Sequence, residues 1–307
     1  MVKVFIDGSA GTTGLRIADR LAQRRDLELL FLPEVLRKDP NARRDALFAA
    51  DVAFLCLPDE AAKESAALAQ GSKVKIIDTS TAHRTSDSWV YGFPELAGLR
   101  EKIASSSRIA NPGCHASGFV ALVAPLVEQG IISKDAKLSC FSLTGYSGGG
   151  KKMIAQYENP ARDVLYDAPR QYATAQAHKH LPEMVKLCGL TNPPVFCPVV
   201  ADFYSGMEVT VSLFGSDIKG SIEDIRQLYA DYYKTGLVKY SDATDPDGLL
   251  SAGAYSGRDD MQVCVAGNEE RILLISRFDN LGKGASGAAI QNMNILLGID
   301  EATGLTV

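Results

Sequence analysis

Apolar and polar positions alternate in two different ways along the first third of the chain. Four short runs rich in β-branched and aromatic residues have the length of strands: 2–7, 27–32, 51–57 and 74–78. Between them apolar residues recur at helical spacing, as at Leu15, Ala18 and Leu21. Strands that alternate with helices predict a parallel sheet with helices on both faces.

The pattern changes after about residue 135, where strands follow one another with few helices between them. The predicted strands are 137–144, 195–201, 207–214, 261–267 and 271–280. A helix that opens with a capping pattern, Ser221 before Glu223, is predicted over 221–233, and an apolar helix over 284–298. This part of the chain predicts an α+β domain on a largely antiparallel sheet.

The composition is that of a globular protein, with 46% apolar and 22% charged residues, and the 307 residues are enough for two domains. The formal net charge is −5 and the basic residues are scattered, which argues against a nucleic-acid-binding surface. No apolar run approaches the ~18 residues of a membrane helix. Small anions remain suitable ligands, because they need only a few local cations.

The amino-terminal segment begins at once as a strand pattern, so we expect no cleaved leader. The six cysteines lie at positions 56, 114, 140, 188, 197 and 264, without a C-x-x-C pair. In a chain of this length they indicate reduced thiols, most of them core residues, and a cytoplasmic protein.

A glycine-rich loop, G-S-A-G-T-T-G, follows the first predicted strand and opens the first predicted helix. Glycines let such a turn close and let a pyrophosphate approach the backbone at the helix N-terminus. Because the spacing differs from the commoner G-x-G-x-x-G, the strand–loop–helix setting carries the prediction of a dinucleotide site. The alternative is a glycine turn that only packs. The expected cofactor contacts are Gly8, Ser9, Gly11, Thr12, Thr13 and Gly14.

The residues after the second predicted strand bear on the choice between NAD and NADP. Glu34 lies near the position of an acid that would bind the ribose, which favours NAD. Against it, the cations Arg37, Lys38, Arg43 and Arg44 crowd the same segment and could hold a 2′-phosphate, unless they are simply a solvated charge run. Since cations outnumber acids here, the sequence favours NADP, with Arg37 and Lys38 as its contacts.

The stretch N-P-G-C stands directly before a helix pattern whose apolar face begins at Phe119. Pro112 has a fixed φ angle and Gly113 lacks a side chain, so the chain can turn sharply just before Cys114. Cys114 would then lie at a helix N-terminus, where the macrodipole stabilises a thiolate. A free cysteine is more often a packing residue, and the other cysteines keep that interpretation. The turn and the helix start favour a nucleophile at Cys114.

A thiolate nucleophile needs an acid–base partner, and the chain has only four histidines. The polar stretch A-H-K-H-L-P-E-M supplies His178 and His180, which are the better candidates, while His83 and His115 remain as alternatives. The pair could also be half a metal site, but no cluster at ligand spacing completes one, so no metal is expected.

Two further segments suit an anion. D-T-S-T-A-H-R follows the fourth predicted strand, at the carboxyl end where parallel sheets bind ligands, and it ends in Arg84. T-G-Y-S-G-G-G-K-K combines glycine-rich backbone with Lys151 and Lys152, as in an anion-binding nest, although it could instead be a flexible hinge.

Taken together, the motifs resemble those of the N-acetyl-gamma-glutamyl-phosphate reductase family in its short form, in the same order from residue 1 to about 300. They are G-S-A-G-T-T-G, D-T-S-T-A-H-R, F-P-E-L, N-P-G-C, T-G-Y-S-G-G-G-K, H-K-H-x-P-E and D-N-L-G-K-G-A-S-G-A-A-I-Q-N. The resemblance implies NADPH-dependent reduction of an acyl phosphate to an aldehyde in arginine biosynthesis. It also implies a dimer or tetramer.

The resemblance implies roles for particular residues. The nucleophile falls on Cys114 and the histidine pair on His178 and His180. Substrate contacts fall on Arg84, Asn111, Ser147 and Lys151, with Lys152 as the alternative cation. Many longer relatives end this last loop in arginine, so the choice between the two lysines stays open. The glycine-rich segment 282–287, with Gly282 and Gly284, is similar to one that lies near the nicotinamide.

The expected fold is α/β, in two domains. A Rossmann-type parallel-sheet domain spans 1–112 and is completed by the C-terminal helix 284–307, and an α+β catalytic and oligomerisation domain spans 113–283. Aspartate-semialdehyde dehydrogenase, a reductase of a carrier-bound aminoadipyl phosphate and a non-catalytic NADP-sensing module remain alternatives. A short-chain dehydrogenase is excluded, because none of the eleven tyrosines has lysine four residues on.

Overall fold

The structure, a computed structural model, describes residues 1–9 and 11–307, without the side chain of Thr12. The chain divides into two compact units: Met1–Pro112 with Ala285–Leu305, and Gly113–Gly284 with Thr306–Val307. The last two residues join the second unit, whereas the sequence placed them with the first. There the Thr306 N–H donates to the Asp259 carboxylate at 2.9 Å, and the Asp259 N–H donates to the Thr306 carbonyl at 2.7 Å.

The first unit contains a six-stranded sheet in the order β2-β1-β3-β4-β6-β5. All neighbouring strands are parallel, which confirms the prediction for this half. Its strands are β1 (Val2–Asp7), β2 (Leu27–Leu30), β3 (Val52–Leu55), β4 (Lys75–Asp78), β5 (Val90–Tyr91) and β6 (Arg108–Ala110). Every residue of β3 is buried, as expected for a central strand that is covered on both faces.

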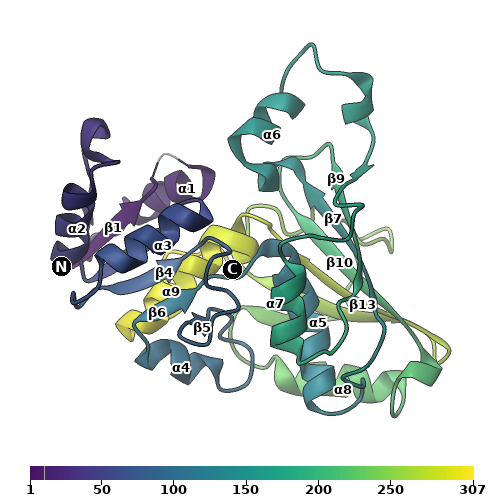
Figure 1. Cartoon of the computed structure of the whole chain (residues 1–307). Coiled ribbons are helices and arrows are strands. Elements are labelled where there is room, and N and C mark those ends of the chain that lie inside the picture. The colour runs from purple at the N-terminus through teal and green to yellow at the C-terminus, as the bar shows by residue number, and fades with distance from the viewer. Residues whose placement is uncertain (10) are drawn as a thin grey trace. The chain divides into compact units, whose positions relative to one another are not determined.

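Most helices of this unit pack on one of the two faces of the sheet. The helices are α1 (Thr12–Leu21), η1 (Glu34–Leu36), α2 (Pro40–Ala49), α3 (Asp59–Leu68), α4 (Leu99–Ser105) and α9 (Gly287–Leu297). One buried cluster joins α1 and α9 to the sheet, and the other involves Leu47 of α2 and the opposite side chains of β3 and β4. Figure 1 shows α9, in yellow, lying along the sheet beside β4 and β6. The predicted doubly covered parallel sheet is confirmed.

The second unit contains a seven-stranded sheet in the order β11-β12-β13-β10-β7-β9-β8. Its strands are β7 (Ser139–Gly145), β8 (Arg170–Gln171), β9 (Val195–Ala201), β10 (Met207–Phe214), β11 (Val238–Tyr240), β12 (Met261–Gly267) and β13 (Arg271–Phe278). Only β7 with β9 and β11 with β12 pair in parallel, and the other neighbours are antiparallel. The prediction of a largely antiparallel sheet is confirmed.

One face of this sheet carries α5 (Cys114–Glu128), α7 (Leu181–Cys188) and α8 (Ile222–Tyr232) (Figure 1). Nearly all of α5 is buried, and a Cβ at Gly118 would lie 2.5 Å from Val209, so the helix approaches the sheet closely. The hydroxyls of Tyr229 and Tyr233 on and after α8 donate to α5 carbonyls, the second at 2.6 Å. These contacts fix the helix that begins at Cys114.

Among the described residues, no helix combines the length and the apolar composition needed to cross a membrane. Even the apolar α5 has 15 residues, fewer than the roughly 20 that a bilayer requires.

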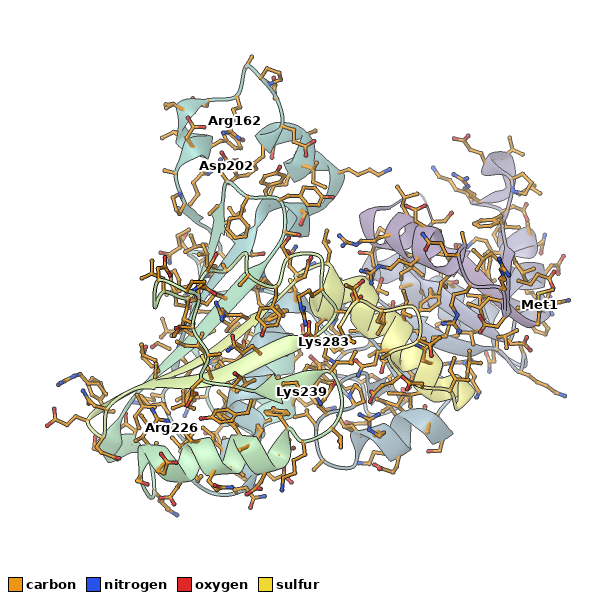
Figure 2. The ribbon with its side chains drawn as sticks, turned by 180° about the vertical axis from the view of Figure 1, so that it is seen from behind. Met1, Arg162, Asp202, Arg226, Lys239 and Lys283 are labelled. Atoms are coloured by element: carbon orange, nitrogen blue, oxygen red, sulfur yellow. The ribbon has the colours of Figure 1, made fainter. Side chains whose placement is uncertain are left out.

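An arm that extends from the ends of β7 and β9 contains η2 (Tyr146–Gly149), α6 (Gly150–Tyr157) and η3 (Val164–Asp167) (Figure 1). The rings of Tyr146 and Tyr157 stack with centroids 4.8 Å apart. The Arg162 guanidinium lies 2.6 Å from each of the Asp167 and Asp202 carboxylates, and Figure 2 shows Arg162 and Asp202 together in the arm. The arm therefore has its own small aromatic core and a charged clamp.

Candidate active site

Cys114 is the first residue of α5, as the sequence predicted. Gly113 caps the helix with an extended backbone (φ −80°, ψ 143°), and the Ser117 N–H donates to the Gly113 carbonyl at 2.8 Å to close the first turn. The Cys114 side chain is half-buried. By contrast, burial raises the pKa of Cys56 to about 12 and also raises the pKa of Cys140, as expected of packing residues.

Glu183 connects Cys114 to the histidine pair. Its carboxylate is buried on α7, and Oε2 accepts from the Gly113 N–H at 3.2 Å. Its Oε1 lies 3.9 Å from Nε2 of His180, the residue that caps α7. One buried carboxylate therefore holds the backbone just before Cys114 and faces one of the two candidate histidines.

His115, which the sequence left as an alternative base, is fully engaged. Its Nδ1 lies 2.6 Å from the Ser142 hydroxyl and its Nε2 lies 2.6 Å from the Tyr172 hydroxyl. Burial, together with the charges of His178 and Lys179, lowers the pKa of His115 to about 3. His115 is consequently neutral near pH 7 and does not supply a proton.

Tyr172 is the other partner in this pair. Burial raises the pKa of its phenol, and the charge of Cys114 raises it further, so Tyr172 stays protonated beside the thiol. The neutral His115 ring fixes the position of the Tyr172 hydroxyl, because their contact is short.

His178 and His180 pack edge to face, with ring centroids 4.7 Å apart, and each lies 5.6 Å from the His115 ring. The His180 N–H donates to Nδ1 of His178 at 3.2 Å. A nitrogen that accepts this bond carries no proton, so the neutral His178 ring has its proton on Nε2. His180 is buried, whereas His178 is half-buried. The structure brings the predicted pair into the same unit as Cys114.

No group of His, Cys, Asp and Glu within the described ranges has the arrangement of a metal site.

Gly284 packs against the candidate nucleophile. A Cβ built on it would lie 2.9 Å from Cys114 Cβ, and one on Gly282 would lie 2.0 Å from the Arg258 carbonyl oxygen. Both glycine N–H groups donate to the Asp279 carbonyl, at 3.0 and 3.1 Å, as the chain enters the π-helix Gly282–Ser286. These two glycines, expected at the nicotinamide, are also required by packing inside the second unit.

The predicted anion nest at 144–152 is partly used by the protein itself. The backbone N–H groups of Gly145, Tyr146 and Ser147 donate to carbonyls of the 203–206 segment at 2.9–3.0 Å. Ser147 is buried, and its hydroxyl accepts from Asn280 Nδ2 at 3.0 Å. Lys151 and Lys152, in contrast, are exposed at the start of α6, where they are available to an anion.

The glycine loop of the first unit fits a dinucleotide. Gly8 has φ +91°, and a Cβ there would lie 2.3 Å from the Cys56 carbonyl oxygen. A Cβ on Gly14 would lie 2.5 Å from the Gly8 carbonyl oxygen, so both positions require glycine. At the exposed Gly11, which caps α1, a Cβ would make only ordinary contacts, the nearest at 3.5 Å. The chain itself does not need glycine there, which leaves room for a phosphate.

Ser9 and Thr13 are half-buried. Thr12 begins α1, and its side chain lies outside the described residues.

The cations counted toward a 2′-phosphate separate into two groups. Arg43 is buried and pairs with Asp7 at 3.0 Å, so this residue is structural and drops out of the set. Arg37 and Lys38 are exposed just after the exposed Glu34, and the exposed Arg44 lies over the Phe48 ring. The contact of Arg37 and Lys38 with a 2′-phosphate stays a prediction.

Arg84 and Asn111 meet inside the first unit. The Arg84 guanidinium donates to the carbonyl oxygens of Asn111 at 2.9 Å and Thr79 at 3.1 Å. The Asn111 side chain donates to the Ala285 carbonyl at 3.0 Å and accepts from Asn292 at 3.3 Å. Because its amide is used in this way, the structure favours a positioning role for Asn111 over the predicted direct contact with phosphate.

His83 also belongs to the first unit. Its Nδ1 lies 2.6 Å from the buried Asp78 carboxylate, and its ring stacks on Trp89 with centroids 4.0 Å apart. These contacts explain the residue as part of the local packing around the start of the Arg84 segment.

Sequence reasoning missed several residues of the second-unit cluster. Ser142 and Tyr172 stand in no motif, and they join the cluster only because β7 and the segment after β8 lie beside β9. Glu183, however, is part of the quoted H-K-H-x-P-E motif, and its spacing after His180 was a usable signal.

Sequence comparison gives the family. The chain is 46% identical over 318 residues to N-acetyl-gamma-glutamyl-phosphate reductase 2 of a Nostoc species, with 99% of both chains covered. The chain belongs to the N-acetyl-gamma-glutamyl-phosphate reductase family. A relative of the same name from Brucella ovis is 43% identical over 312 residues, covering 96% of this chain and 99% of the relative. The resemblance inferred from the motifs is confirmed.

The domain models agree with membership of this reductase family. Residues 33–106 match the NAD binding domain of semialdehyde dehydrogenases, and residues 114–280 match their dimerisation domain. Aspartate semialdehyde dehydrogenase II from Vibrio cholerae has the same fold, with a TM-score of 0.74 and 18% identity over 97% of this chain and 98% of that one. The predicted fold class is confirmed.

Proposed function

We propose that this chain catalyses the NADPH-dependent reduction of N-acetyl-gamma-glutamyl phosphate to N-acetylglutamate semialdehyde and phosphate, in arginine biosynthesis. Family membership and the two semialdehyde dehydrogenase domain models support the reaction. The observation that carries it is the half-buried Cys114 at the start of α5, in the same unit as the packed histidine pair.

The first unit would hold the cofactor. Gly8, Gly11 and Gly14 and the N-terminus of α1 suit a pyrophosphate, and the exposed Arg37 and Lys38 suit a 2′-phosphate, which favours NADP over NAD. When bound, NADPH supplies the hydride for the reduction. Gly282 and Gly284 would border the nicotinamide, where a side chain is excluded by the packing already described.

Cys114 would act as the nucleophile. Its thiolate attacks the acyl carbonyl carbon, the carbon–sulfur bond forms, and the bond from that carbon to the phosphate oxygen breaks. The resulting thioester is reduced, and the hemithioacetal alkoxide collapses to the aldehyde and regenerates the thiolate. One proton is consumed in each turnover, and it ends on the departing phosphate.

The two histidines suit different parts of this sequence. His178 in its neutral form presents an Nε2–H donor, which can bind the oxygen that becomes negative in both tetrahedral states. His180 Nε2 lies beside the Glu183 carboxylate, which can orient the imidazole, so we assign proton delivery to His180. The first-turn N–H groups of α5 add donors for the same oxygen.

Substrate recognition would use a few cationic and polar side chains. Arg84 would attract the phosphate while it also fixes the carbonyl of Asn111, three residues before the nucleophile. In the second unit, Ser147 is held by Asn280, and Lys151 is the exposed cation proposed to contact the substrate. Comparing Lys151→Ala with Lys152→Ala would show which of the two raises the KM for the semialdehyde.

We also propose that the enzyme is a homodimer of the cytoplasm. The face of the second sheet opposite α5 carries exposed apolar side chains on three different strands, which suits association of two copies: Phe141, Phe214 and Leu273. The description of the matched domain model, a dimerisation domain, supports this. No disulfide joins the cysteines in the part of the chain that the structure describes, which suits a reducing compartment. Light scattering that gives a monomer or a tetramer would refute the dimer.

The experiment is the reverse reaction, followed as phosphate-dependent formation of NADPH from NADP and N-acetylglutamate semialdehyde. The wild-type chain should turn over this aldehyde and should not turn over aspartate or aminoadipate semialdehyde at a comparable rate. Turnover of one of the other two in its place would keep the chemistry and reject the substrate. Turnover with NAD alone would reject the cofactor.

A further inference from the structure

The segment between Tyr172 and His178 has an unusual backbone. Among the residues that the structure describes, Ala173 (φ 52°) and Gln176 (φ 55°) are the non-glycine residues with positive φ. The Gln176 N–H donates to the Ala173 carbonyl at 3.0 Å, so the two residues bracket one tight turn. A left-handed conformation costs a non-glycine residue roughly 1–2 kcal/mol, and it persists only where other contacts impose it.

The side chain of Gln176 supplies such contacts. Its Nε2 donates to the Phe196 carbonyl at 2.8 Å, and its Oε1 accepts from the Phe196 N–H at 2.8 Å. The amide thus pairs with both backbone groups of one β9 residue, as a neighbouring strand would. The antiparallel pairing of β8 with β9 ends just before this point, where the Tyr172 N–H donates to the Pro198 carbonyl at 3.1 Å.

Phe196 needs a partner at this edge because it is fully buried, and buried backbone groups are almost always hydrogen-bonded. Its ring packs against the His115 ring at 5.3 Å and against the His178 ring at 5.1 Å. The residue whose backbone binds Gln176 is therefore the residue whose ring contacts two histidines of the cluster.

We propose that Gln176 is a positioning residue for the reaction, which fixes His178 by docking its side-chain amide on the edge of β9 at Phe196. Gln176 itself is largely exposed and contributes no side chain to the core, and it precedes His178 by two positions. The docked amide sets where the turn ends, and the turn sets where the imidazole lies against Phe196. This inference rests on the proposed function of His178.

Three substitutions separate the amide from the backbone turn. Gln176→Ala removes both hydrogen bonds. Gln176→Glu keeps an acceptor for the Phe196 N–H but places a second oxygen against the Phe196 carbonyl. Gln176→Asn keeps the amide and suits a positive φ better than glutamine does, but it is one methylene too short to reach β9. If the amide docking matters, all three variants fail alike, whereas if only the turn matters, Gln176→Asn behaves like wild type.

We expect each variant to lower kcat of the reverse reaction roughly tenfold, about 1.4 kcal/mol of barrier. The KM for NADP should stay unchanged, because the cofactor loop is untouched. The pH profile of kcat should shift, since a displaced His178 has a different environment, and a purely structural effect would leave the profile in place. The matched control is Gln227→Ala, an exposed glutamine on α8 that bonds only within its own helix at 2.9 Å.

Two measurements do not depend on activity. Histidine-labelled protein should show displaced His178 imidazole signals in the three variants and not in the control, and the Phe196 amide should lose its protection from hydrogen exchange. If these signals move while no aldehyde is turned over by the wild-type chain, the docking stands and the proposed function fails. If the Phe196 amide is released while kcat and the His178 signals remain those of wild type, the proposal is overturned.

Discussion

The glycine loop of the first unit and the thiol–histidine cluster of the second are built in opposite ways. The loop uses consecutive residues, and its two essential glycines are demanded by backbone atoms of the neighbouring Cys56 and of the loop itself. The cluster uses side chains from α5, β7, the segment after β8, and α7, which are far apart in the sequence. A backbone constraint on consecutive residues produces a motif that can be recognised in the sequence. A site assembled from distant side chains does not, and only some of its residues, such as Cys114 and the histidine pair, can be recognised.

This difference also predicts how each region fails. Damage to the loop should appear as lost stability or lost cofactor affinity, with the chemical step intact. Damage to Cys114 or to the histidine pair of the cluster should appear in turnover, with the fold and cofactor binding intact, whereas damage to the neutral His115 should appear in stability. Four sets of substitutions test this separation, and they follow in order of decreasing effect.

Cys114→Ser should lower turnover by a factor of about 10⁴ or more. A serine hydroxyl is far less acidic than a cysteine thiol, so it would stay protonated and be a weak nucleophile. NADP affinity and melting temperature should stay at wild-type values, since the two side chains have nearly the same shape. Rates come from the reverse assay and affinity from calorimetry. Turnover within tenfold of wild type would remove Cys114 from the mechanism.

Gly8→Ala should destabilise the first unit by roughly 3 kcal/mol or more, because the new Cβ would stand 2.3 Å from a backbone oxygen at a left-handed φ. Gly11→Ala is the matched control. Its Cβ meets nothing closer than 3.5 Å, so unfolding by urea should be near wild type while the Kd for NADP rises. Equal loss of stability in both variants would contradict the conclusion that the fold requires glycine at position 8 but not at position 11.

His178→Gln should retain clearly more turnover than His178→Ala, which we expect to lose about 10²-fold, since the glutamine amide can replace an Nε2–H donor. His180→Gln should instead behave like His180→Ala and lose one limb of the pH–rate profile, because glutamine cannot carry a proton to phosphate. The reverse pattern would exchange the two assignments. NADP binding, which depends on the first unit, should be unaffected in all four variants.

Substitution of His115 should change the free energy of unfolding and its pH dependence rather than the turnover rate. Its pKa is about 3 in the folded chain against 6.5 unfolded, so between these values the unfolded state binds more protons. Stability therefore falls as the pH falls below about 6.5, by roughly 1 kcal/mol per pH unit. The difference between wild type and His115→Gln in urea unfolding from pH 7 to about 4.5 isolates this contribution. A constant difference across that range would mean that the ring titrates with the same pKa in the folded and the unfolded chain.

The sequence predicted the two sheets, the helix that begins at Cys114 and the family, because each depends on local periodicity or on a contiguous motif. It did not predict the arm around α6, whose stability comes from tyrosine stacking and the Arg162 clamp between distant segments. Nor did it find Tyr172 or Gln176, which act through β9. Arg43 was misplaced because a charge run gives no sign of which member pairs with the buried Asp7.

The return of α9 to the first unit has a consequence for synthesis on the ribosome. Residues of α9, including Ile290 and Met293, complete the buried cluster that begins with Val4 and Ile6. At roughly 5–20 residues per second, the amino-terminal strands wait some tens of seconds for this helix to emerge. Meanwhile the second unit lacks only its two-residue tail and can close first. The newly made amino-terminal sheet is thus the surface that chaperones would meet.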